Sequence, residues 1–401
     1  MNRVDELIAK FCPNGVKYKA LDAVCDYVDY RGKTPKKTEK GIFLVTAKNI
    51  RKGYIDYEAS KEYVALEDYD LVMRRGYAEI GDVLITTEAP CGNVALVDRK
   101  NIALAQRVIK YRCHECLDSR FLLHVLLATE FQSKLNKAAT GGTVRGIKGS
   151  KLHKLTVPVP PLEVQREIVH ILDSFTLLTA ELTAELTARK KQYEFYRNKL
   201  LAFELEKCSK SKLSEIAQIY DGTHQTPEYT LKGIPFISVE NINDIYSSSK
   251  YISKEAYNKY KIKPQVKDVF MTRIGSIGKC AIMTHHTDLA YYVSLALIRP
   301  NAEVLDSRYL KHYIESSFGT RELARRTLHN AVPIKINKDD IGKIVIKYPN
   351  IEIQRKIADI LDNFDKICSD LRTGLPAEIE ARQKQYEYYR DKLLSFKELP
   401  K

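Results

Sequence analysis

Basic side chains gather in a few turn-rich segments of the sequence. Residues 143–151 form a glycine-punctuated basic loop, and a pair of arginines precedes Gly76. Lys and Arg neutralise DNA phosphates, whereas Arg, Asn and Gln can form paired hydrogen bonds with base edges. For any one residue, a solvated surface position is the competing interpretation. We predict DNA contacts by Arg31, Lys33, Thr34, Lys48, Arg74, Arg75, Thr143, Arg145, Lys148, Gln225, Thr226, Arg273, Arg325, Arg326 and Lys335.

Residues that could carry covalent or metal chemistry do not form a recognisable set in the sequence. Cys113 and Cys116 make one Cys-x-x-Cys pair, but a structural zinc site needs a second pair of ligands at a workable spacing. Residues 275–280 contain Gly-Lys without the spacing and the Ser or Thr of a phosphate-binding loop. We therefore predict no catalytic residue, no metal site and no cofactor held by this chain.

Composition and charge favour a basic, folded chain of two or three domains. The 401 residues carry a net charge of +14, which raises the odds of an anionic partner, nucleic acid first. Gly and Pro, at 18 and 14 residues, are scarce, so long uninterrupted elements are expected. No apolar stretch is long enough for a membrane span, and no signal peptide is expected. We expect a cytoplasmic protein whose eight cysteines are free thiols.

The sequence repeats itself. Residues 165–175 return as residues 354–364, and residues 191–201 return as residues 384–394. Fainter matches precede both blocks, such as residues 41–45 with residues 233–237. The chain is therefore organised as variable, constant, variable, constant, with a unit of about 190 residues.

The constant parts have the apolar spacing of long helices. Apolar and aromatic residues recur in steps of threes and fours, which is typical of coiled coils. We predict that the two helices pair antiparallel within the chain, with an intermolecular coiled coil as the alternative. The residues predicted for this helix pairing and for partner contacts are Ile168, Leu172, Phe175, Leu182, Leu186, Tyr193, Tyr196, Ile357, Leu361, Phe364, Leu371, Tyr386 and Tyr389.

The two constant parts differ in their middles. The first contains a tandem Thr-Ala-Glu-Leu at residues 179–186, and each such unit adds about 6 Å and a net rotation of about 40° to a helix. The second contains Gly374 and Pro376, and a proline inside a helix removes a hydrogen bond. We expect a kink or a break near these two residues.

The variable parts, residues 18–160 and 211–348, are predicted to be two copies of one α+β domain. Short β-rich runs at residues 43–46, 82–86, 236–239 and 268–272 alternate with glycine-containing turns. One helix is expected in each copy, over residues 119–135 and over residues 307–323.

The motifs of the constant parts resemble the specificity subunit of type I restriction–modification systems. The resemblance rests on Pro-Pro-Leu-Glu-Val-Gln-Arg-Glu-Ile at residues 160–168, on the repeated Ile-Leu-Asp-x-Phe, and on Arg-Lys-Lys-Gln-Tyr-Glu-x-Tyr-Arg at residues 189–197. It covers essentially the whole chain. It implies an α+β chain with an internal pseudo-twofold repeat: two similar α/β target recognition domains, separated by two long helices that form an antiparallel coiled coil.

The resemblance also implies the domain limits and the partners. Recognition domains would cover residues 1–160 and 207–349, and spacer helices residues 161–206 and 350–401. Each domain would read one half of a split, asymmetric site on double-stranded DNA. The subunit itself would be non-catalytic and would bind two methyltransferase and two restriction subunits. S-adenosylmethionine, ATP and Mg²⁺ would belong to those partners.

Two hypotheses and three alternatives follow. An added Thr-Ala-Glu-Leu unit should lengthen the gap in the DNA site by about one base pair, because 40° is close to the twist of B-DNA per base pair. Exchange of residues 18–160 should change one half-site.

The alternatives are a non-catalytic coiled-coil scaffold, a DNA-modifying enzyme with a divergent site, and the specificity subunit of another restriction–modification class.

Overall fold

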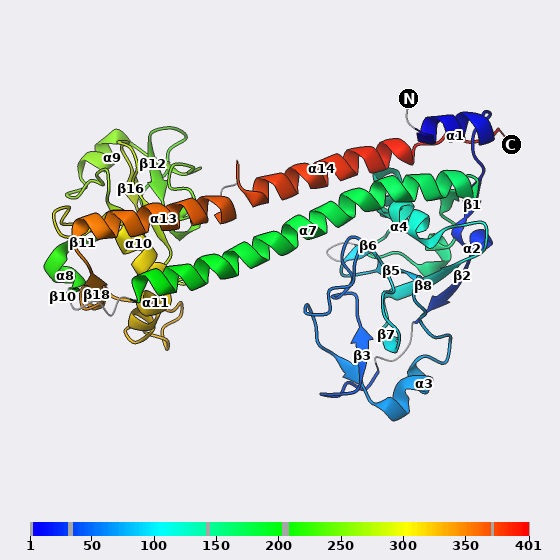
Figure 1. Cartoon of the computed structure of the whole chain (residues 1–401), viewed down its shortest axis with the longest axis horizontal. Helices are drawn as coiled ribbons and strands as arrows, with labels where there is room; N and C mark the ends of the chain where they lie inside the picture. Colours follow the sequence, from blue (N-terminus) through cyan, green and yellow to red (C-terminus); the bar gives the residue numbers. More distant parts are fainter. Residues whose placement is uncertain (1–2, 31–34, 142–144, 203–207, 370–372, 401) are drawn as a thin grey trace. The chain divides into compact units, whose positions relative to one another are not determined.

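The computed structural model describes residues 3–30, 35–141, 145–202, 208–369 and 373–400. The chain divides into two compact units (Figure 1). Each unit consists of an α+β domain and segments of the long helices. Unit 1 comprises Met1–Leu182 and Ile379–Lys401, and unit 2 comprises Thr183–Glu378. Among the described helices, none combines the length and the apolarity that a membrane crossing requires.

Unit 1 is built on a four-stranded antiparallel sheet with the strand order β2-β8-β5-β6. A smaller sheet has the order β4-β3-β7, in which β3 pairs antiparallel with β4 and parallel with β7. One face of the main sheet packs with helix α4 (Ser119–Leu127) in a core around Val83, Ile109 and Phe121. Its other face packs with the small sheet in a second core that includes Leu44 and Leu84. The strands are β2 (Cys25–Asp29), β3 (Ile42–Val45), β4 (Tyr63–Val64), β5 (Val83–Thr87), β6 (Cys91–Leu96), β7 (Ile102–Leu104) and β8 (Val108–Cys113).

A separate two-stranded ribbon closes unit 1 at the base of its domain. Strand β1 (Tyr18–Ala20) pairs antiparallel with β9 (Thr156–Pro158), so the two ends of the domain lie side by side. The helices of this part are α1 (Arg3–Phe11), α2 (Leu21–Val24), η1 (Leu66–Asp68), α3 (Tyr69–Val72), α4 (Ser119–Leu127), α5 (Thr129–Ala138) and α6 (Gly149–Leu152).

Unit 2 repeats this topology. Its main sheet has the order β11-β17-β14-β15, its small sheet the order β13-β12-β16, and its ribbon pairs β10 with β18. The strands are β10 (Ser209–Lys212), β11 (Ala217–Asp221), β12 (Ile234–Ile237), β13 (Tyr251–Ile252), β14 (Val269–Thr272), β15 (Cys280–Ile282), β16 (Ala290–Tyr291), β17 (Leu295–Pro300) and β18 (Val345–Tyr348). The helices are α8 (Leu213–Ile216), η2 (Val239–Asn241), α9 (Lys254–Asn258), α10 (Ser307–Glu315), α11 (Ser317–Ala324) and α12 (Lys338–Gly342). The predicted repeat of one α+β domain is therefore confirmed.

The long helices are shared between the units. Helix α7 (Leu162–Leu201) is one uninterrupted helix of 40 residues, and the division between the units falls after Leu182, between the two Thr-Ala-Glu-Leu copies. The second constant part is divided into α13 (Ile351–Ser369) and α14 (Leu375–Leu393), which confirms the predicted break. Pro376 lies in the first turn of α14, where its missing N–H removes no helical hydrogen bond.

The single helix expected after each main sheet is wrong in both units. Helix α4 ends at Leu127 and α5 starts at Thr129, while Ala128 has an extended backbone with ψ of 146°. In unit 2 the break falls at Ser316, whose hydroxyl accepts from the N–H groups of Phe318 and Gly319. The breaks let two short helices follow each sheet, where the sequence pattern suggested one.

Candidate nucleic-acid interface

Several segments that carry predicted DNA contacts lie at one edge of the main sheet in unit 2, where strands end. Strands β11 and β14 end at this edge and β17 begins there, because Asp221 pairs with Ala296 and Thr272 pairs with Leu295. The loop of residues 222–233 follows β11, and the loop of residues 273–279 follows β14. We call this part of unit 2 the recognition edge.

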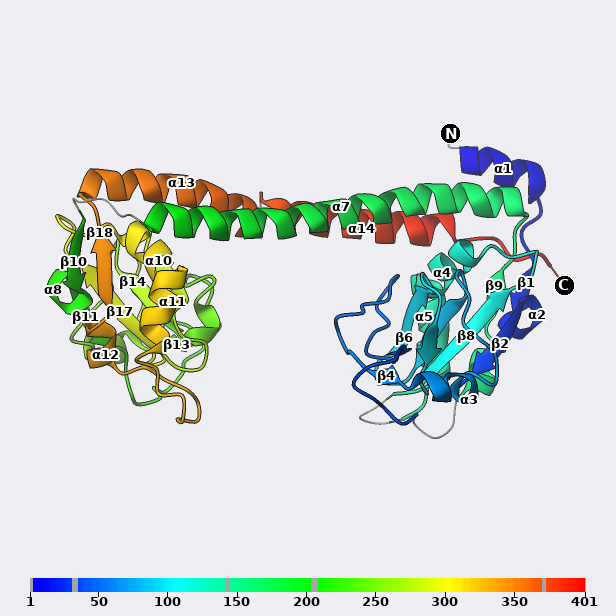
Figure 2. The same cartoon turned by 60° about the horizontal axis from the view of Figure 1, so that its bottom comes forward.

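A third segment, the loop of residues 328–336, joins the recognition edge through backbone hydrogen bonds. The N–H of Gly275 donates to Ile334 O at 2.9 Å, and the N–H of Ile336 donates to Arg273 O at 3.0 Å. Figure 2 draws this loop between α11 and α12 as a projection on the side of unit 2 away from α13. Residues from three distant stretches of sequence therefore meet at one edge.

The predicted residues of unit 2 differ in what they can contact. Gln225, Thr226, Arg325 and Lys335 are exposed. Arg326 is half-buried and pairs with the carboxylate of Glu322 at 2.8 Å, and Arg325 pairs with the same residue at 3.1 Å. Exposed, flexible cations at a sheet edge suit contacts with phosphates, whereas the carboxylate of Glu322 offsets part of the charge of both arginines.

Arg273 is buried, so a direct DNA contact by this side chain does not fit its position. Its guanidinium forms an ion pair with Asp221 and donates through Nε to Ile336 O at 3.1 Å. Asp221 ends β11, and Ile336 ends the loop of residues 328–336. Arg273 thus joins three segments of the recognition edge, and we assign it a positioning role.

Unit 1 has a recognition edge of the same construction. Asp29 of β2 pairs with Ile109, and Thr86 of β5 pairs with Val108, so β2 and β5 approach one edge where β8 begins. The loop around Gly146 is attached there, since the N–H of Ile147 donates to Thr87 O at 2.9 Å.

The predicted residues of unit 1 gather in part at this edge. Arg145 and Lys148 are exposed on the attached loop. Arg75 is exposed and donates to the carbonyl of Asp29 at 2.6 Å, so it also lies at the end of β2. Lys48 and Arg74 are exposed as well, and their contact with DNA stays a prediction. Arg31, Lys33, Thr34 and Thr143 lie outside the described residues.

One cation at this edge was missed by sequence reasoning. Arg107 directly precedes β8, has a positive φ of 73°, and pairs with Glu88 at 3.1 Å. Its carbonyl accepts from the N–H of Thr87 at 2.9 Å. The sequence around Arg107 has no glycine or basic neighbour that would have marked it as a loop residue.

A buried histidine holds the domain of unit 1 to both long helices. His124 of α4 contacts the hydroxyl of Tyr386 through Nδ1 at 2.9 Å and the carboxylate of Asp173 through Nε2 at 2.9 Å. Tyr386 belongs to α14 and Asp173 to α7. Arg120 adds a second contact to Asp173 at 2.5 Å. One side chain therefore fixes the domain against two helices at once.

Unit 2 has the same arrangement. His312 of α10 contacts the hydroxyl of Tyr193 at 3.0 Å and the carboxylate of Asp362 at 2.8 Å. Tyr193 and Tyr386 occupy equivalent positions of the repeated Lys-Gln-Tyr-Glu motif. The motif that signals the constant helices in the sequence thus binds the variable domain in the structure.

These hydrogen-bond networks explain why the pKa values of Asp173 and Asp362 are lowered. Burial by itself would raise the pKa of Asp173, but hydrogen bonds from His124 and Arg120 outweigh it and hold the pKa below its ordinary value. The pKa of Asp362 is lowered in the same way, with burial opposed by the hydrogen bond from His312 and by the charge of Arg308. Both carboxylates are therefore held ionised, which suits paired contacts with donors.

A buried glutamine makes a second link in each unit. In unit 1, Gln165 of α7 accepts from the N–H of Asp118 at 2.8 Å and donates to the carbonyls of Cys116 and Pro160 at 2.9 and 2.7 Å. Gln354 of α13 repeats all three contacts in unit 2, beginning with the N–H of Asp306 at 2.9 Å. Asp118 in turn accepts from the first N–H groups of α4, so the glutamine positions the start of that helix.

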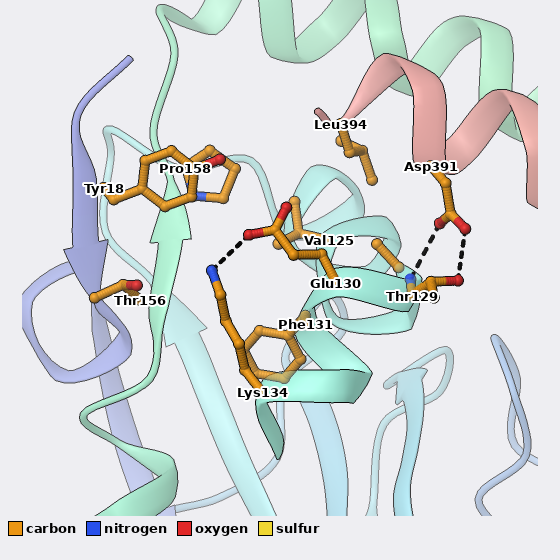
Figure 3. Close-up of a pocket in the computed structure, with 11 residues that line it drawn as sticks. Tyr18, Val125, Thr129, Glu130, Phe131, Lys134, Thr156, Pro158, Asp391 and Leu394 are labelled. Atoms are coloured by element: carbon orange, nitrogen blue, oxygen red, sulfur yellow. Dashed lines mark hydrogen bonds and ion pairs between the residues drawn. The ribbon is translucent and has the colours of Figure 1, made fainter. Parts of the chain in front are cut away.

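In each unit, a side chain of a long helix also accepts a hydrogen bond from the first turn of the second short helix, α5 or α11. Asp391 of α14 accepts from the backbone N–H of Thr129 at 3.1 Å and from its hydroxyl at 2.5 Å (Figure 3). In unit 2, Asn198 of α7 accepts from the N–H of Ser317 at 3.0 Å. Figure 3 also shows the ion pair of Lys134 and Glu130, at 2.6 Å, which lines the same pocket as Thr129 and Asp391.

Six of the thirteen residues predicted to form the helix pairing are buried in the domain cores. Ile168, Leu172 and Tyr386 are buried in the core of unit 1, and Tyr193, Ile357 and Leu361 in that of unit 2. Helix–helix stacking is present as well. Phe175 stacks on Tyr389 with ring centroids 5.4 Å apart, and Tyr196 stacks on Phe364 at 5.8 Å. Leu182 and Leu186 are half-buried. Leu371 lies outside the described residues.

The cysteine pair noted in the sequence is arranged differently from a metal site. Cys113 lies beside Cys25 on the neighbouring strand, with 3.9 Å between the sulfur atoms. Across the part of the chain that the structure describes, no group of three His, Cys, Asp or Glu residues is placed to hold a metal ion.

Comparisons with known proteins agree with the repeat. The family model described as the type I restriction modification DNA specificity domain matches residues 13–189 and again residues 206–381. The specificity subunit of the type I restriction enzyme EcoR124I/EcoR124II from Escherichia coli is 36% identical over 61% of this chain, and the match spans 63% of that protein. A putative specificity subunit from Haemophilus influenzae is 29% identical, over 95% of this chain and 96% of its own length.

Solved structures have the same fold. The specificity subunit of a type I system from M. genitalium superposes with a TM-score of 0.58 at 14% identity, covering 95% of this chain and 96% of that chain. A chain from a structural study of the assembly and conformational transition of the type I system gives a TM-score of 0.61 at 19% identity, covering 95% and 98%. The chain belongs to the family of type I restriction–modification DNA specificity subunits, and it carries the specificity domain of that family twice.

Proposed function

We propose that each unit reads one half of a split, asymmetric DNA site at its recognition edge. The observation that carries this proposal is that both units bring exposed cations to the same edge of the same sheet. They are Arg75, Arg145 and Lys148 in unit 1, and Lys335 in unit 2, where exposed Arg325 ends the helix that leads into the same loop. The recognition edges differ in sequence, so the two half-sites differ. Proteins of this family recognise DNA sequence and are non-catalytic.

We further propose the domain limits and the assembly. The ribbons β1–β9 and β10–β18 bracket residues 18–158 and 209–348, which supports recognition domains within residues 1–160 and 207–349. The chain would join two methyltransferase subunits and two restriction subunits in the cytoplasm. Those partners would use S-adenosylmethionine, ATP and Mg²⁺. The exposed aromatic residues of the repeated motif, Phe195 and Tyr388, are available for subunit contacts.

Removal of two cations from one recognition edge tests the proposal. In the complex with its methyltransferase subunits, the Arg145→Gln, Lys148→Gln double variant is expected to bind cognate DNA more weakly. The slope of log K against log salt concentration is negative, and it should become less steep by about 1.8. Each lost phosphate contact removes about 0.9 from this slope. Titrations of labelled duplex at several salt concentrations measure this.

Lys19→Gln is the matched control for this experiment. Lys19 is exposed on β1, which is joined through α2 to the start of β2, at the end of the main sheet away from the recognition edge. The control should keep the slope of the unmodified complex. Equal slopes for the double variant and for the unmodified complex would contradict a DNA contact by this edge.

A further inference from the structure

The loop of residues 328–336 in unit 2 presents apolar side chains to solvent at the recognition edge. Val332 is 100% exposed, and Leu328 and Ile334 are 42% and 38% exposed. Isolated exposed apolar residues are common on proteins. Three of them lie within seven residues here, on a loop that Figure 2 draws as a projection from the domain.

The base of this loop is firmly attached. The N–H of Leu328 donates to Lys335 O at 2.8 Å, which closes the loop on itself, and Ala331 donates to Leu328 O at 3.2 Å. The buried guanidinium of Arg273 and the backbone of Gly275 fix the second half of the loop to the segment after β14. A side chain on an attached loop loses little conformational freedom on binding, which favours selective contacts.

The charges around the loop match a DNA partner. Lys335 is exposed next to Ile334, and Arg325 is exposed on the segment that leads into the loop. In the major groove, the apolar group on a base edge is the thymine methyl, and apolar side chains read it by contact. A compact aliphatic side chain on a loop that also carries a cation suits this group, because cations bind the neighbouring phosphates.

We propose that Val332 contacts a thymine methyl group in the half-site read by unit 2, and that Arg273 positions the loop for this contact. The inference rests on the proposed function, since it assigns one base contact to a recognition edge. Unit 1 has a loop of the same construction, closed by hydrogen bonds between Thr140 and Gly146. Its residues 142–144 lie outside the described part of the chain.

The test combines a protein variant with a base analogue. The cognate site is first defined by sequencing methylated DNA, and duplexes are then made in which deoxyuridine replaces one thymine at a time, so that only a methyl group is lost. Binding is measured with the full chain in complex with its methyltransferase subunits. The unmodified protein is expected to bind about fivefold more weakly when one particular thymine of the unit 2 half-site loses its methyl group.

Val332→Ser is the decisive variant, and Val266→Ser is its control. Val266 has the same side chain, is 44% exposed, and precedes β14 at the end of the sheet away from the recognition edge. Val332→Ser should bind the cognate site about fivefold more weakly and should be insensitive to the deoxyuridine replacement. Val266→Ser should behave as the unmodified protein in both respects.

The outcomes separate this inference from the proposed function. If the complex prefers its site but Val332→Ser binds it unchanged, or keeps the full methyl dependence at every thymine, the contact by Val332 is overturned while the proposed function stands. If the unmodified complex shows no sequence preference at all, the proposed function itself is overturned.

Discussion

Insertion of one further Thr-Ala-Glu-Leu unit after Leu186 is expected to lengthen the gap between the two half-sites by about one base pair. Helix α7 belongs to both units and is uninterrupted, so four added residues extend it by about 6 Å and rotate it by a net 40° or so. The prediction rests on this rotation, because B-DNA turns by about 34–36° per base pair. Sequencing of methylated adenines in cells that carry the variant measures the gap.

Two controls frame this experiment. Deletion of residues 183–186 should shorten the gap by one base pair, whereas Thr183→Ser keeps the length of α7 and should leave the gap unchanged. Both half-sites should keep their sequences in every variant. A gap that stays constant while the insertion variant still methylates DNA would contradict the role of α7 as the spacer.

Gln165→Leu is expected to destabilise unit 1 by about 3 to 5 kcal/mol, since it leaves one buried N–H and two carbonyls without partners. Leucine has a similar volume, so the loss is chiefly one of hydrogen bonds. Gln354→Leu should do the same to unit 2, because it makes the equivalent contacts. Denaturant unfolding of the full chain, with a probe in each unit, measures the two losses separately.

Gln383→Leu provides the control for the glutamine variants. Gln383 is exposed on α14, and its amide donates to the carboxylate of Glu387 at 3.1 Å. Its replacement should change the free energy of unfolding by less than about 0.5 kcal/mol. Comparable losses in Gln383→Leu and Gln165→Leu would show that burial of the amide does not matter.

Much of the fold could be predicted because its motifs and its apolar spacing occur twice in the sequence. The repeat, the long helices and the break near Pro376 follow from spacing and from proline chemistry. The break after α4 has no local signal, because it falls at Ala128, whereas the break after α10 falls at Ser316, a residue type that favours helix N-caps. At both breaks a distant side chain adds a hydrogen bond: Asp391 accepts from Thr129 and Asn198 accepts from Ser317, each more than a hundred residues away.

The sequence indicated which loops carry the basic residues of the candidate site, but it could not show which of these side chains are exposed. Loops rich in basic residues were expected to bind DNA, and the structure brings several of them to one edge in each unit. Sequence could not distinguish the buried Arg273 from exposed Lys335, because burial is set by the partner Asp221 on another strand. It also passed over His124 and His312, although the matching Leu-Asp-Ser-Arg at residues 117–120 and 305–308 marked the helices that carry them.

The most direct test of the account exchanges one recognition domain and reads the methylated site. Residues 18–158, which begin and end at the β1–β9 ribbon, are replaced by the corresponding segment of another family member, and methylated adenines are sequenced in cells with the methyltransferase subunits. We predict a bipartite, asymmetric site in which one half changes, while the other half and the gap are preserved. A change in both halves, or a single undivided site, would contradict the account.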